Sequence, residues 1–151
     1  MEEPNATRLF LGDEANWAGA SIELYDVQAL WGGRRIYAEW SKKTVVRLVE
    51  RGSHLERRYE VALGKDEITR LFDLFVEQDF LTIHPAERPG IPDEARPRIG
   101  LASGGGDKRE VAKWAGVEDD RFETLYRALL CLEALVADLD PVYVGPYEAV
   151  T

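Results

Sequence analysis

The chain has 151 residues, of which 45% are hydrophobic and 31% are charged, and its formal net charge is −9. This length is typical of one domain, and the composition is that of a globular protein that buries a core without disulfides or metals. The sequence pI near 4.8 weighs against nucleic-acid binding, because a basic surface supplies most non-specific affinity for phosphate backbones.

The single cysteine, Cys131, excludes a disulfide within one chain. It lies in an apolar helical run, so we expect a small buried thiol rather than a nucleophile. No stretch approaches the roughly 18 apolar residues of a membrane span, and the acidic amino terminus lacks a signal-peptide core. We therefore expect a cytoplasmic protein that does not contact a membrane.

The first 19 residues are expected to form an arm and a loop. Residues 7–11 fit either a short strand or a packing arm, and residues 12–20 are rich in turn-forming residues. Residues 21–30 then alternate apolar and polar side chains in their first half, which predicts a strand.

Residues 34–63 predict an antiparallel meander. Residues 55–63 alternate as a strand with one buried face does, and residues 44–50 are rich in β-branched side chains. Gly52, between these two runs, can take the positive φ that a tight hairpin requires. A third strand is predicted over residues 36–40, where apolar and polar residues again alternate.

This meander is basic although the whole chain is acidic. From position 34 to position 58 there are eight basic and three acidic residues, a local net charge of +5. One interpretation is a solvated sheet face on which Arg and Glu pair across strands, and the other is a basic patch that meets an anionic partner. The basic residues are Arg34, Arg35, Lys42, Lys43, Arg47, Arg51, Arg57 and Arg58.

A helix is predicted over residues 65–79, where apolar residues recur at the spacing of one helical face, with Gly64 or Asp66 as its cap. Residues 80–83 read as a buried connector. Residues 84–97 follow as a loop with four prolines, and loops of this length are commonly functional.

Two further strands, at residues 98–102 and 110–114, flank three consecutive glycines. A hairpin turn is favoured over a phosphate-binding loop there, because a strand-like segment follows rather than a helix. Asp119 or Asp120 is expected to cap a second helix that runs to about residue 136, and the apolar tail of residues 140–151 is expected to dock on the body.

The order of elements predicts a single α+β domain over residues 1–151, with a mostly antiparallel sheet of five or six strands and two helices packed on one face. A helix that closes on Phe80, a Pro92-Asp93 loop, a glycine-turn hairpin and a leucine-rich final helix together resemble small bacterial α+β domains of unknown function. The resemblance covers residues 21–139. It carries no catalytic residues to transfer.

The preferred hypothesis is a non-catalytic binding or protein-interaction module, which self-associates through its sheet or binds a protein partner. A small ligand, or a basic partner for the acidic remainder, is also compatible. If both helices cover one sheet face, the rings of Trp31, Tyr37, Trp40, Tyr59 and Trp114 either line the open face or belong to the core, and Arg and aromatic residues are enriched at interfaces. The candidate contact residues are Arg34, Arg35, Tyr37, Trp40, Arg47, Arg58, Tyr59 and Trp114.

The alternative is a small hydrolase-like enzyme that uses the loop of residues 84–97. His84, Asp93 and Glu94 would then do acid/base work, whereas the competing interpretation is a solvated loop. Neither the two histidines nor Cys131 has the spacing of a transition-metal site, so no metal or cofactor is predicted.

Overall fold

The computed structural model describes residues 3–28 and 31–148. Within them the chain forms one antiparallel sheet of seven strands in the order β6-β5-β1-β2-β3-β4-β7, together with three α-helices. The strands are β1 (Ser21–Gln28), β2 (Gly32–Glu39), β3 (Thr44–Val49), β4 (Leu55–Val61), β5 (Arg98–Ala102), β6 (Lys108–Ala112) and β7 (Tyr143–Pro146). The helices are α1 (Ala6–Leu11), α2 (Lys65–Glu77) and α3 (Asp120–Ala134).

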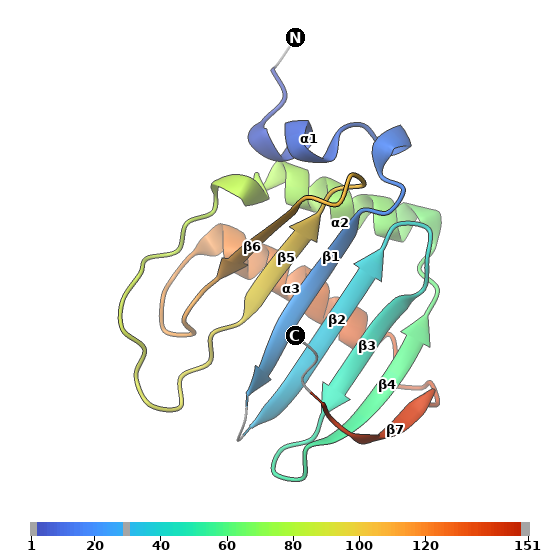
Figure 1. Ribbon diagram of the computed structural model, residues 1–151, viewed down its shortest axis with the longest axis vertical. Helices are drawn as coiled ribbons and strands as arrows, with labels where there is room; N and C mark the ends of the chain where they lie inside the picture. Colours follow the sequence, from blue (N-terminus) through green and yellow to red (C-terminus); the bar gives the residue numbers. More distant parts are fainter. Residues whose placement is uncertain (1–2, 29–30, 149–151) are drawn as a thin grey trace.

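The predicted α+β class and antiparallel sheet are therefore confirmed, but the described residues form seven strands rather than five or six, and three α-helices rather than two. Helices α2 and α3 cover one face of the sheet and leave the other without a helix, as Figure 1 shows from the uncovered side. Alternate residues of the central strands, among them Ile22, Leu24, Ile36 and Ala38, are fully buried beneath the helices. We call the uncovered surface the helix-free face.

Both long helices begin at caps that satisfy free backbone N–H groups. The Gly64 amide at the start of α2 donates to the Glu67 carboxylate at 3.1 Å. The Asp119 carboxylate at the start of α3 accepts from the Phe122 amide at 3.0 Å. The sequence offered two candidate caps for each helix. Helix α2 begins at Gly64 rather than at Asp66, and α3 begins at Asp119 rather than at Asp120.

Residues 7–11 form helix α1 rather than a strand. The Asn5 side chain accepts from the Arg8 amide at 2.9 Å, which supplies the N-cap that favours a helical turn. Asp79, at the far end of α2, accepts from the backbone and hydroxyl of the buried Thr7 at 3.1 and 2.8 Å. This short helix is therefore tied to the body by a buried polar contact.

The carboxyl-terminal segment adds the seventh strand. In β7, Tyr143 lies opposite Arg58 of β4, and the Val142 amide donates to the Arg58 carbonyl at 2.7 Å. The strand is only four residues long and its side chains are mostly exposed. It therefore lacks the alternation by which a strand is found in sequence.

Cys131 is exposed, and the prediction of a buried thiol is wrong. The buried stripe of α3 runs through Phe122, Leu125, Leu129 and Leu132. Cys131 lies off this stripe, on the part of the helix that faces a groove between α3 and α2.

The start of β2 depends on a close backbone approach at Gly33. A β-carbon there would lie 1.9 Å from the Asp26 carbonyl oxygen, whereas at Gly52, also at positive φ, it would meet nothing within 4 Å. We expect Gly33→Ala to lower the free energy of unfolding by about 3 kcal/mol, and Gly52→Ala by about 1 kcal/mol. Urea denaturation measures both; equal losses would contradict the close approach.

Candidate functional site

A row of arginines crosses the helix-free face at right angles to the strands. The register places Arg47 opposite both Arg35 and Arg58 on its neighbouring strands. Tyr25 lies between Arg35 and Arg98. We call these four arginines and Tyr25 the arginine row. Like charges directly opposite one another destabilise a sheet, so the row requires compensating groups.

Glu56 of β4 is the most buried of these groups. Its side chain is 1% exposed and accepts hydrogen bonds from Arg47 Nη2 and Arg58 Nε, each at 2.7 Å. Burial acts to raise the pKa of Glu56, but the hydrogen bonds and charges of Arg47 and Arg58 outweigh it, so the pKa lies below its ordinary value. Glu56 is therefore a carboxylate at neutral pH and neutralises part of the row.

The outer arginines of the row have their own partners. Glu23 lies 3.6 Å from Arg35, and Glu110 lies 3.2 Å from Arg98. The guanidinium groups of Arg35 and Arg98 also stack over the Tyr25 ring, at 4.8 and 4.7 Å from its centre. Such contacts between cations and rings hold arginines in fixed orientations.

The segment after β7 covers part of the row. The Arg47 guanidinium lies 5.2 Å from the centre of the Tyr147 ring, and burial raises the pKa of Tyr147. The Tyr147 amide donates to the His54 carbonyl at 2.9 Å, which fixes the segment at this end of the sheet. Arg58 and Arg98 remain accessible, with side chains 37% and 43% exposed.

Every basic residue between positions 34 and 58 has a partner. Seven form ion pairs, and the eighth, Arg51, stacks over Trp31 at 4.0 Å. This pattern favours the interpretation in which Arg and Glu pair across strands. Four carboxylates from outside residues 34–58 offset most of the local net charge of +5, namely Glu23, Asp26, Glu60 and Glu133.

Four of the eight predicted contact residues come together on the helix-free face, namely Arg35, Tyr37, Arg47 and Arg58. The other four lie elsewhere. Arg34 faces α3, where it pairs with Asp26 and Glu133; Trp40 packs on Trp17 and Phe72; Tyr59 packs against the core; and Trp114 lies under Arg96.

Two aromatic residues that were considered for an open face, Trp40 and Tyr59, are therefore partly buried and pack against the core. Tyr59 lies opposite Val46, which is fully buried beneath the helices, so its parity places it on the covered side. Sequence reasoning missed Tyr25 and Arg98, which belong to the row. Only the pairing of β1 with β5, strands separated by about 70 residues, brings them there.

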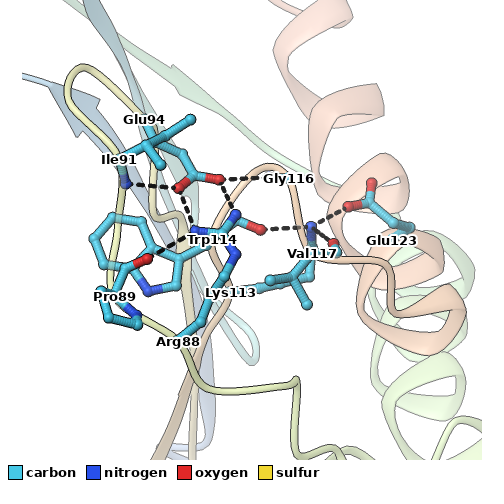
Figure 2. Close-up of polar contacts among 9 residues, drawn as sticks. All are labelled: Arg88, Pro89, Ile91, Glu94, Lys113, Trp114, Gly116, Val117 and Glu123. Atoms are coloured by element: carbon cyan, nitrogen blue, oxygen red, sulfur yellow. Dashed lines mark hydrogen bonds and ion pairs between the residues drawn. The ribbon is translucent and has the colours of Figure 1, made fainter.

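In the loop of residues 84–97, the Glu94 carboxylate accepts hydrogen bonds from one side chain and two backbone amides (Figure 2). It accepts from Arg88 at 2.8 and 2.5 Å and from the Gly116 amide at 2.8 Å. The Ile91 amide adds a longer hydrogen bond of 3.3 Å. The bond to Arg88 is the main cause that lowers the pKa of Glu94 from 4.5 to about 2.

The acid/base hypothesis gains no support from this geometry. Glu94 is occupied by Arg88 and stays ionised, while Asp93 is exposed in a turn at a φ of 64°. His84 lines a different hollow, beside β6, together with Arg96 and Arg109. The three residues of the hypothesis therefore do not converge on one point.

Comparisons with protein-family models, curated proteins and solved structures found no match to this chain. Among the helices of residues 3–28 and 31–148, none is long and apolar enough to cross a membrane. The same residues contain no group of three His, Cys, Asp or Glu side chains that could hold a metal ion.

The ionised Glu94 predicts a pH-dependent opening of the loop. A carboxylate with a lowered pKa stabilises the folded arrangement above pH 4.5, and this contribution is lost as the pH falls toward about 2. We expect the Gly116 amide to lose hydrogen-exchange protection over this range. In Glu94→Gln the protection should be weak at every pH, with amides of β1 as the internal control. A wild-type profile that does not change between these pH values would contradict the role of Glu94.

Proposed function

We propose that this protein is a non-catalytic protein-interaction module whose contact surface is the helix-free face. The arginine row carries this proposal. It presents partly exposed arginines beside Tyr37 and Tyr143, each 37% exposed, on strands of a hydrogen-bonded sheet. Arg and Tyr are enriched in the energetically dominant parts of protein interfaces, and side chains already ordered by stacking lose little entropy on binding.

A second copy of this chain is the partner that fits the charge of this face. The described strand residues of the face balance five cations against five carboxylates, whereas residues 65–79, which include α2, carry five carboxylates and two cations. Two chains of net charge −9 repel each other least where their surfaces are neutral. The balanced residues are Arg35, Arg47, Arg58, Arg98 and Lys108 with Glu23, Glu39, Glu56, Glu60 and Glu110.

The spacing of the charges suits a two-fold arrangement. A second row of residues, which contains Glu23, Glu60 and Glu110, runs parallel to the arginine row. Each residue of this second row lies two positions along its strand from the arginine row, a distance of about 7 Å. A two-fold axis that lies parallel to the two rows and midway between them places each residue of one row opposite the residue two positions along the same strand of the second copy. Arg58 of each copy then meets Glu60 of the second copy.

Charge exchange at this pair tests the proposal. Sedimentation equilibrium should show a dimer of the wild-type chain at low salt. We expect Arg58→Glu and Glu60→Arg each to weaken the dimer about tenfold or more, because each creates two like-charge contacts per dimer. The double variant should recover most of the affinity, since it restores opposite charges across the axis.

The control is Arg70→Glu on the exposed surface of α2, which makes the same charge change away from the face and should leave the dimer unchanged. Both Arg58→Glu and the double variant lose the bond to Glu56, so recovery in the double variant cannot come from folding. A wild-type chain that stays monomeric at submillimolar concentration, or a double variant no better than either single one, would overturn the proposal.

A further inference from the structure

Strand β6 forms one edge of the sheet, and within residues 3–28 and 31–148 no strand lies beyond it (Figure 1). The edge at the other end of the sheet differs, because β7 pairs there with β4 although it is only four residues long and mostly exposed. A short extended segment can therefore close an edge of this sheet through backbone hydrogen bonds. The edge of β6 has no such segment among the described residues.

The pairing of β6 with β5 shows which backbone groups of β6 point outward. The Ser103 amide donates to the Asp107 carbonyl at 2.8 Å, and the Lys113 amide donates to the Pro97 carbonyl at 3.1 Å. Both pairs continue the register of the two strands, and hydrogen-bonded pairs recur at every second residue of an antiparallel ladder. Residues 109 and 111 are therefore bonded to β5. The residues of β6 whose N–H and C=O groups point away from β5 are Lys108, Glu110 and Ala112.

Most of these outward groups are unused. The Lys108 carbonyl accepts from Arg109 Nη1 at 3.0 Å. The other outward N–H and C=O groups form no hydrogen bond within the described part of the chain. They are the groups that an added strand uses when it extends an exposed sheet edge.

A hollow of about 520 Å³ lies beside this edge. Residues 109–112 of β6 line it on one side, and side chains between positions 80 and 87 line it on another. The lining is partly apolar, through Leu81, Pro85 and Val111, and the volume is in the range of ligand sites in proteins. Every second side chain of a strand added to β6 would point to the same side of the sheet as Arg109 and Val111, and so into this hollow.

The charges around the hollow favour an acidic segment. Three guanidinium groups line it, those of Arg96, Arg98 and Arg109, against the carboxylates of Glu87 and Glu110. Glu87 is 85% exposed and lies 3.9 Å from Arg96, so this pair contributes little. Arg109 is exposed and has no carboxylate partner among the described residues. Its remaining N–H groups are available to a carboxylate from outside the chain.

We propose that the edge of β6 binds an extended acidic segment of another protein, which adds a strand to the sheet. The backbone of this segment bonds to Lys108, Glu110 and Ala112, and one of its carboxylates pairs with Arg109 at the hollow. The edge points outward in the plane of the sheet rather than toward the helix-free face. Binding here therefore does not depend on the proposed self-association.

The test uses a short blocked peptide in which valine and glutamate alternate, and hydrogen exchange followed by ¹H–¹⁵N spectra. At saturation this peptide should slow the exchange of the outward amides of Lys108, Glu110 and Ala112 at least tenfold. The amides of Arg109 and Val111, which already bond to β5, should change little. Protection without this alternation would contradict strand addition, and no protection would mean that the charges of β6 only keep its edge from pairing.

A matched peptide tests the preference for acidic segments. It carries glutamine in place of each glutamate and should bind at least fivefold more weakly. Arg109→Gln should weaken the glutamate peptide and leave the glutamine peptide unchanged, whereas Arg70→Gln, on the exposed surface of α2, should affect neither. Equal affinities of the two peptides for the wild-type chain would refute the proposed pairing with Arg109.

Variants at one position test the backbone bonds. Ala112→Pro removes one outward N–H and leaves the bonds to β5, because proline is tolerated where the N–H of an edge strand faces solvent. It should weaken the glutamate peptide at least fivefold, whereas Ala112→Val, which keeps the N–H, should not. Protected amides of β1 report that each variant is folded. Equal affinities of the two variants would show that the peptide does not add to this edge.

Arg58→Glu separates this site from the proposed self-association. The variant weakens the proposed dimer but leaves the edge of β6 intact, so its affinity for the glutamate peptide should equal that of the wild-type chain. A loss of peptide binding in Arg58→Glu would place the peptide on the helix-free face and would overturn the assignment to the edge.

Discussion

The helix-free face depends on one buried carboxylate, Glu56, between two arginines of adjacent strands. Arg47 and Arg58 lie directly opposite each other, an arrangement that repels unless a negative charge lies between them. Glu56 lies on the same strand as Arg58, two residues earlier, and so reaches both guanidinium groups from the same face. Burying that carboxylate costs free energy, which its two charge-assisted hydrogen bonds offset.

This constraint gives the sheet two different sides. The side beneath α2 and α3 is stabilised by apolar burial, with Ile22, Ile36 and Phe72 fully inaccessible to solvent. The helix-free side is held by stacked rings and paired charges, of which the exposed pairs are each worth little. A face of this kind leaves oriented charges for another surface, which is the basis of the proposed interaction.

Much of the fold follows from local sequence pattern. The β3–β4 hairpin, α2 and α3 are found from alternation, Gly52 and a helical apolar stripe, because these signals depend on neighbouring residues. The candidate site is harder to predict from the sequence, because the arginine row forms only through the pairing of strands that are distant in the chain. Arg98, for example, belongs to the row because β5 pairs with β1. The bonds between Glu94 and Gly116 likewise join segments 22 residues apart, and no local pattern predicts them.

The charge state of Glu56 tests this account most directly. A ¹³C-detected titration of its side-chain carboxyl group gives the pKa of that one residue in the folded protein. We predict a pKa below the ordinary glutamate value of 4.5, because Arg47 and Arg58 outweigh burial. A pKa at or above 4.5 would mean that burial dominates and that the arginine row is not held by this carboxylate.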